Sequence, residues 1–146
     1  MMLNEWDAQE FRLTGSFPQS GPHSGFGLAI LIVEDHPLIA LDLETMLLKC
    51  GIERVTIATS IAQALTFIEA GTFDAALLDV RAGEELTVPV AAALRLAETP
   101  FAFTTAYDID SAALVAFKAH PVIKKPYSEH EIRDVLSQLL KPRYGP

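Results

Sequence analysis

The chain has 146 residues, of which 50% are hydrophobic and 21% are charged, and this composition suits one domain with a full hydrophobic core. Acidic residues outnumber basic ones by 19 to 11, and the formal net charge of −8 argues against binding to nucleic acid. The single cysteine, Cys50, excludes an intramolecular disulfide, and no apolar run approaches the roughly 20 residues of a membrane span. Since the acidic N-terminus also lacks a signal-peptide pattern, we expect a cytoplasmic protein with no membrane partner.

The first 27 residues differ in composition from the rest of the chain. The segment GSFPQSGPHSGFG is rich in Gly, Ser and Pro, as linkers are. Before it, Leu3, Trp6, Phe11 and Leu13 lie at spacings that suit one side of a short helix. The segment is therefore either a disordered tail or an arm that packs on this domain or on a partner. Its deletion is expected to leave the chemistry of the domain intact.

From Leu28 onward, short apolar runs typical of buried strands alternate with helical patterns. Pro37 and Pro89 suit first helical turns, and Ser60 and Ser128 each begin a capping box. Strands are predicted at 28–34, 54–59, 73–79, 101–105 and 121–124, and helices at 37–50, 60–70, 89–98, 110–118 and 128–140. In the first helix, one amphipathic stripe is formed by Leu38, Leu41, Thr45 and Leu48.

This alternation predicts a parallel sheet with helices on both faces. In such α/β sheets the functional site lies at the carboxyl ends of the strands. The chain divides into an N-terminal arm and linker (1–27), the folded domain (28–141) and a short tail (142–146).

Polar side chains follow four of the predicted strands: Glu34 and Asp35 the first, Asp79 the third, Thr105 the fourth and Lys125 the fifth. Each alone also suits a cap, a strand end or a solvated surface, but together they converge on one edge. Two carboxylates 4 Å apart repel by about 4 kcal/mol at an effective dielectric near 20, so a positive group is expected among them. Mg²⁺ prefers such oxygen ligands, and a lysine can pair with a phosphoryl oxygen.

These residues, with Pro126 after the lysine, resemble the signature of response-regulator receiver domains (CheY-like) over about residues 28–140. The resemblance implies a flavodoxin-like doubly wound sheet with strand order 2-1-3-4-5. It also implies that Asp79 accepts a phosphoryl group from a histidine kinase or a histidine phosphotransferase, and that the Lys125–Pro126 peptide is often cis. Further implied roles are Mg²⁺ binding by Glu34, Asp35, Asp79 and the backbone carbonyl of Arg81, and contacts to phosphoryl oxygens by Thr105 and Lys125.

The sequence departs from the usual receiver pattern at two places. Val122 occupies the position, three residues before the lysine, where the family usually has an aromatic switch residue. The loop after Asp79 lacks the common proline-glycine-aspartate pattern. The stretch PFAFTTAY resembles the PFxFATGY motif of a single-domain alphaproteobacterial subgroup. Tyr107, at its end, is then a candidate switch residue, although simple packing near the surface fits it equally well.

Two other functions fit the sequence less well than phosphoryl acceptance. A phosphatase that uses a strand-end aspartate needs a second carboxylate two residues later, where this chain has Arg81. FMN binding needs a glycine- and hydroxyl-rich loop after the first strand, and the segment EDHPL lacks these residues. A receiver-like module that binds partners without phosphorylation stays open. We expect a signalling domain and no enzyme beyond self-catalysed phosphoryl transfer and autodephosphorylation. The short C-terminus suggests no output domain, which leaves partner docking, phosphorelay or a phosphate sink as the role of the chain. The oligomeric state stays open: the face near Val122 and Tyr127 suits a homodimer, and simple packing at its rim fits the aromatic residue equally well.

Overall fold

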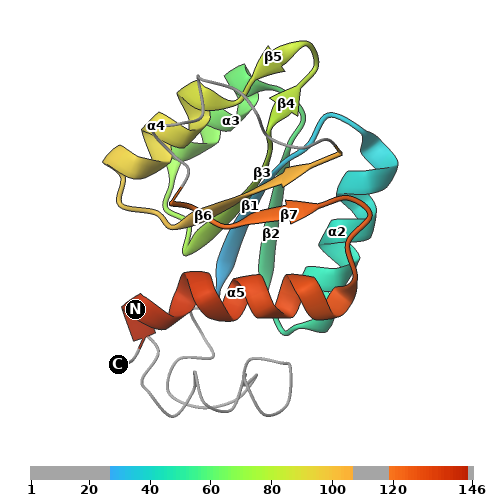
Figure 1. Cartoon of the computed structure of the whole chain (residues 1–146). Coiled ribbons are helices and arrows are strands. Elements are labelled where there is room, and N and C mark those ends of the chain that lie inside the picture. Colours follow the sequence, from blue (N-terminus) through green and yellow to red (C-terminus); the bar gives the residue numbers. More distant parts are fainter. Residues whose placement is uncertain (1–26, 107–118, 145–146) are drawn as a thin grey trace.

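The computed structural model of the chain describes residues 27–106 and 119–144. At its centre lies a five-stranded parallel sheet (Figure 1). Its order is β2-β1-β3-β6-β7, which confirms the predicted order 2-1-3-4-5 and the flavodoxin-like fold. The strands are β1 (Ala29–Val33), β2 (Arg54–Ala58), β3 (Ala75–Asp79), β6 (Phe101–Thr105) and β7 (Val122–Lys124).

Helices cover both faces of the sheet (Figure 1). Because side chains alternate along a strand, Ile30 and Ile32 of β1 enter one core cluster while Leu31 and Val33 enter the other. All four side chains are fully buried, which explains why β1 reads as an unbroken apolar run. The first cluster contains residues of α2 (Pro37–Lys49) and α5 (Glu129–Tyr144), and the second contains residues of α3 (Ile61–Ala70) and α4 (Val88–Leu96).

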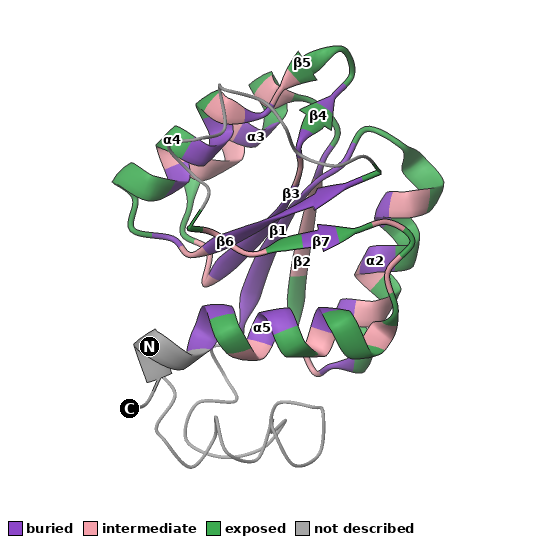
Figure 2. Ribbon diagram, viewed as in Figure 1, coloured by how far each residue is buried: buried purple, intermediate pink, exposed green. Residues whose placement is uncertain are grey.

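The packed face of α2 differs from the predicted stripe. The buried residues of this helix are Ala40, Leu43 and Leu47. Leu38 and Leu41 are 72% and 53% exposed, and α2 accordingly shows exposed segments on its outer side (Figure 2). Leucines stand at helical spacing on two faces of α2, so periodicity alone selected the wrong one.

The helix starts predicted from Ser60 and Ser128 are confirmed. Glu131 donates its backbone N–H to Ser128 Oγ and accepts the N–H of Ser128 at its Oε1, both at 3.1 Å, which is a complete capping box for α5. Ser60 caps α3 by accepting the N–H of Gln63. The end of α5 was predicted too early, because this helix continues to Tyr144.

The segment after Asp79 forms an antiparallel hairpin that was not predicted. Its two short strands are β4 (Arg81–Ala82) and β5 (Glu85–Leu86). Gly83 supports the turn with φ of 66°, a conformation that costs glycine little.

Some predictions fall outside the described residues. These are the N-terminal arm up to residue 26, the helix at 110–118 and the switch candidate Tyr107. Within the described ranges, no helix has the length and apolar character that crossing a membrane requires.

Candidate acidic site at the carboxyl edge of the sheet

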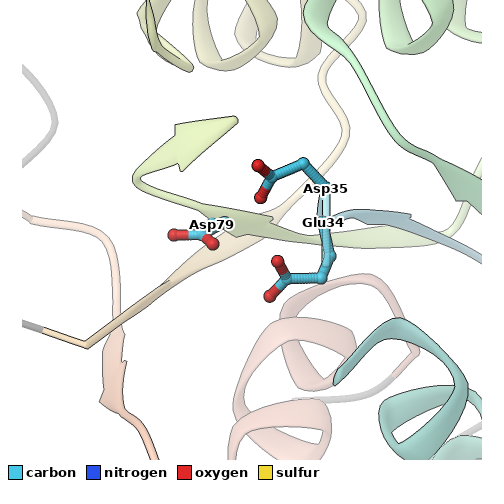
Figure 3. A group of neighbouring side chains, drawn as sticks. All are labelled: Glu34, Asp35 and Asp79. Atoms are coloured by element: carbon cyan, nitrogen blue, oxygen red, sulfur yellow. The ribbon is translucent and has the colours of Figure 1, made fainter. Parts of the chain in front are cut away.

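Adjacent strands bring three carboxylates together. Asp79 is the last residue of β3, and Glu34 and Asp35 directly follow β1, its neighbour in the sheet. One carboxylate oxygen from each residue lies within 4.8 Å of those of the other two. Figure 3 shows the three side chains around a common space at this edge. The cluster predicted from the strand ends is therefore present.

Glu34 is the most buried of the three carboxylates, with 2% of its surface exposed. Its Oε2 accepts the backbone N–H of His36 at 3.1 Å, and its Oε1 accepts a hydrogen bond from Lys125. Burial raises the pKa of Glu34, although the hydrogen bonds from Lys125 and His36 act in the opposite direction. A buried carboxylate of this kind is retained only with a cationic partner or a metal.

Lys125 provides a positive charge to two of the carboxylates at once. Its Nζ lies 2.8 Å from Asp79 Oδ2 while it also pairs with Glu34. Burial lowers the pKa of Lys125, but the hydrogen bonds to Asp79 and Glu34 outweigh this effect and leave the pKa raised. The side chain is thus held as an ammonium group. The Lys125–Pro126 peptide is cis, as the resemblance implies.

The β4–β5 hairpin contributes backbone groups to the site. Gly83 donates its N–H to Asp35 Oδ2 at 2.9 Å. The N–H of Arg81 is directed at Asp79 Oδ1, at 3.3 Å. The guanidinium of Arg81 instead contacts the carbonyl of Glu84 at 3.5 Å and therefore belongs to the hairpin itself.

The hairpin geometry also determines which way the carbonyl of Arg81 points. Val80 turns its carbonyl toward the returning strand, where it accepts the N–H of Thr87 at 2.9 Å. Successive carbonyls alternate in an antiparallel pair, so the carbonyl of Arg81, which is opposite Leu86, points away from that strand. It lies on the same edge as the Arg81 N–H that contacts Asp79. This direction is compatible with the predicted role of the Arg81 carbonyl as a metal ligand, which stays a prediction.

Thr105 lies at the same edge as the carboxylates. It is the last residue of β6, which neighbours β3, and it is buried. Its carbonyl accepts the N–H of Lys125 at 2.7 Å and thereby fixes the start of the segment that presents the lysine.

Val122 and Tyr127, near β7, differ in their surroundings. Val122 is 48% exposed, as expected for a residue on an edge strand. Tyr127 is partly buried, and it packs against the core cluster that α2 and α5 share. The Tyr127 hydroxyl is buried without a hydrogen-bond partner among the described residues, and burial raises the pKa of this group. Tyr127 thus packs against the core, in line with the alternative of simple packing, and the homodimer through this face stays a prediction.

Besides the hairpin, the sequence did not predict the Thr87 side chain at the site. Thr87 is fully buried, and its Oγ1 donates a hydrogen bond to the carbonyl of Asp79 at 2.6 Å. A threonine just before Val88 and Pro89 suggests a helix N-cap, but the Thr87 side chain makes no capping hydrogen bond. The sequence therefore carries no specific signal for this contact.

The donor set fits a hard divalent cation. The three carboxylates offer only oxygen ligands, which is the kind of ligand that Mg²⁺ prefers. The ammonium of Lys125 borders the same space and can pair with an anionic group that enters it. The arrangement can thus hold a cation and a phosphoryl group next to Asp79.

Comparisons with known proteins point to the same kind of domain. The family model described as the response regulator receiver domain matches residues 30–137. The solution structure of SdrG from Sphingomonas melonis Fr1 is 39% identical, with 78% of this chain and 97% of that chain covered and a TM-score of 0.68. Its BeF3-activated conformation, from Pseudomonas melonis Fr1, is 36% identical, with 77% and 96% covered and a TM-score of 0.64.

A third structure adds a metal to the comparison. It is the receiver domain of the sensor histidine kinase PA1611 from Pseudomonas aeruginosa PAO1, with a magnesium ion coordinated in its active site cleft. It is 26% identical to this chain, with 78% of this chain and 98% of that chain covered and a TM-score of 0.68. None of the curated proteins compared with the chain reaches significant similarity.

Proposed function

The chain belongs to the response regulator receiver domain family, and on that premise we propose that Asp79 is its phosphoacceptor. One observation carries the proposal: the Asp79 carboxylate stands at the open edge of the sheet with the Lys125 ammonium 2.8 Å away. Glu34 and Asp35 complete an acidic cluster around it. This combination of nucleophile, cation and acidic ligands suits phosphoryl transfer. In that reaction the protein contributes mainly positioning and charge neutralisation.

The proposed reaction is an in-line transfer from a phosphohistidine. A carboxylate oxygen of Asp79 attacks the phosphorus, the new O–P bond forms as the P–N bond breaks, and the imidazole nitrogen leaves with the electron pair. Lys125 neutralises charge on one phosphoryl oxygen, and the hydroxyl of Thr105 donates to another. Hydrolysis of the resulting acyl phosphate returns Asp79 to the carboxylate. The domain is thus a signalling module rather than an enzyme with an external substrate.

Mg²⁺ is the proposed cofactor. Asp35, Asp79 and the carbonyl of Arg81 would hold it directly, and Glu34 largely through water, in keeping with their all-oxygen donor set. When bound, the cation supplies charge neutralisation for the incoming phosphoryl group. The chain's own contribution is to keep the ligands close together and to offset their repulsion with Lys125.

The proposed partner is a histidine kinase or a histidine phosphotransferase. A donor that presents a phosphohistidine to Asp79 must cover the edge of the sheet, where α2 begins just after Asp35. The first turns of α2 expose Leu38 and Leu41, and two exposed leucines beside a polar site suit a protein contact. We place the donor contact on these turns of the helix.

The role downstream follows from the resemblance to single-domain receivers. The 39% identity to SdrG supports membership of the subgroup with the PFxFATGY-type motif, and Tyr107 stays its candidate switch residue. In that subgroup a phosphorylated receiver would act by docking a partner, by relaying the phosphoryl group or by draining it from a kinase. Phosphoryl lifetime, measured with purified kinases, separates a sink from a relay.

The phosphoacceptor is tested by labelling. The full chain is incubated with acetyl phosphate and Mg²⁺ and then analysed by intact mass. We expect a gain of one phosphoryl group that hydroxylamine removes, and no gain on Asp79→Asn. Equal labelling of wild type and Asp79→Asn, or no labelling of either, would refute the assignment, and the second result would favour a module that binds partners without phosphorylation.

A further inference from the structure

Thr87 ties together the two ends of the segment that follows the phosphoacceptor. Its Oγ1 lies 2.6 Å from the carbonyl oxygen of Asp79 and 3.2 Å from that of Val80. Its backbone N–H also donates to Val80, at 2.9 Å. A hydroxyl has one proton to donate, and the shorter distance assigns that proton to Asp79. The side chain is fully buried, so water does not readily replace this hydrogen bond.

The position of Thr87 does not otherwise require a hydroxyl. It occupies the N-cap of α4, yet its side chain caps no backbone N–H of that helix. Val88 and Pro89 begin the helix, and proline in the first turn needs no N–H partner. The hydroxyl is therefore directed back to the end of β3 rather than into α4.

The segment that Thr87 closes is the β4–β5 hairpin, which carries two backbone contacts to the acidic site. Arg81 directs its N–H at Asp79 Oδ1. Gly83 donates its N–H to Asp35. Since both contacts come from a short hairpin outside the main sheet, their geometry depends on how its base is held.

We propose that Thr87 is a positioning residue for the acidic site. Its hydroxyl locks the base of the β4–β5 hairpin to the backbone of Asp79, and this holds Arg81 and Gly83 against Asp79 and Asp35. The consequence for phosphoryl transfer rests on the proposed function, whereas the consequence for the hairpin and for cation binding does not. Mutation of groups that hydrogen-bond to metal ligands and orient them commonly lowers metal affinity by a factor of about ten or more.

Two substitutions separate the hydroxyl from the shape of the side chain. Thr87→Val keeps the volume and removes the donor, and Thr87→Ser keeps the donor. Thr99→Val is the matched control, because Thr99 is also buried but precedes β6, at the opposite end of the sheet. The full chain is used throughout. Three quantities are measured: hydrogen exchange at the Gly83 amide, the dissociation constant for Mg²⁺ by calorimetry, and the rate of labelling by acetyl phosphate at saturating Mg²⁺.

For Thr87→Val we expect faster hydrogen exchange at the Gly83 amide and slower labelling by acetyl phosphate. We also expect the Mg²⁺ affinity to fall by about three- to tenfold, the range that corresponds to the loss of one hydrogen bond. Thr87→Ser is expected to restore all three. Thr99→Val is expected to leave Mg²⁺ affinity and exchange at Gly83 unchanged. If Thr87→Val fails to fold, Thr87→Ala takes its place in the same comparison.

Four results would overturn the proposal. The first is that Thr87→Val keeps the wild-type hydrogen exchange and Mg²⁺ affinity, and the second is that Thr87→Ser does not restore the values lost in Thr87→Val. The third is that Thr99→Val loses as much Mg²⁺ affinity as Thr87→Val, and the fourth is that neither Thr87→Val nor Thr87→Ala folds. A fifth result would refute the proposed function and leave the role of Thr87 intact. If the wild type takes no label while Thr87→Val still alters exchange at Gly83 and Mg²⁺ affinity, Asp79 is not the phosphoacceptor but Thr87 does position the hairpin.

Discussion

Lys125 performs two tasks with one charge. It offsets the repulsion between Glu34 and Asp79, which it contacts together, and it stands where a phosphoryl oxygen would enter. The side chain is 13% exposed and the Glu34 side chain only 3%, so solvent screens this pairing weakly. Removal of the ammonium would leave a buried carboxylate beside another carboxylate with no cation to balance them.

We therefore predict that Lys125→Met is destabilised in a manner that Mg²⁺ corrects. Loss of one partner of a buried ion pair commonly costs about 3 kcal/mol, and the free energy of unfolding in EDTA should fall by roughly that amount. A divalent cation among the carboxylates replaces the missing charge, so added Mg²⁺ should raise the stability of the variant more than that of the wild type. Urea denaturation with and without Mg²⁺ measures both effects.

Lys124→Met is the control for this experiment, because it removes the same charge from the neighbouring position, where the residue is exposed. It should respond to Mg²⁺ as the wild type does. A Lys125→Met variant with wild-type stability in EDTA would show that the Lys125 ion pairs contribute no net stability.

At the residue scale, the sequence predicted the acidic site because parallel strands have a fixed geometry. Glu34, Asp35 and Asp79 each end a recognisable apolar run, and adjacent parallel strands place such ends at one edge. Thr87 could not be predicted in the same way. Its hydroxyl contacts a backbone carbonyl. Every residue has such a carbonyl, so the residue type of the partner gives no sign of the contact.

Helix α2 links the core to the proposed partner contact at the element scale. Leu43 and Leu47 fasten the helix to the sheet, and Leu38 and Leu41 stay exposed close to the acidic site. An exposed leucine loses little when it is replaced by a polar residue, because it buries little surface in the folded protein. These side chains can therefore be changed without harm to the fold.

We predict that the double substitution Leu38→Ser and Leu41→Ser slows phosphoryl transfer from a histidine kinase by about tenfold or more, as expected when two apolar contacts worth roughly 1 kcal/mol each are lost from an interface. Labelling by acetyl phosphate should stay unchanged, because this small donor does not need the helix. Parallel time courses with the kinase and with acetyl phosphate give the rate of the variant relative to the wild type for each donor.

Leu96→Ser controls for the loss of an exposed leucine elsewhere, because Leu96 lies at the end of α4 and is 88% exposed. It should transfer as the wild type does with both donors. Equal slowing of both donors by the α2 substitutions would instead indicate damage to the site, and the proposed contact would be wrong.

Element boundaries were predicted well where local chemistry marks them and poorly where packing decides. The capping box at Ser128 marks the start of α5 in the sequence, and the structure contains both of its hydrogen bonds. The buried face of α2 depends on which leucines meet the sheet, and sequence periodicity permits two answers. The β4–β5 hairpin is too short for an alternating pattern, so only the glycine at its turn, Gly83, hinted at it.

At the scale of the whole molecule, all the described contacts of the acidic site come from residues between Glu34 and Lys125. The sheet itself begins at Ala29, and Leu28 accepts the N–H of Arg54 just before it. The first 27 residues precede all of these elements. The chemistry of the site is therefore expected to be independent of them.

We predict that deletion of residues 1–27 leaves labelling by acetyl phosphate within about twofold of the full chain and lowers the free energy of unfolding by less than about 1 kcal/mol, since the deletion removes no strand, helix or site residue described above. Trp6→Ala combined with Phe11→Ala in the full chain tests the large apolar side chains of the arm separately from its length. Labelling rates and urea denaturation are compared for the three proteins. Loss of labelling or of stability in both variants would mean that the arm packs on the domain through Trp6 and Phe11, whereas loss in the deletion alone would mean that the linker next to β1 is needed.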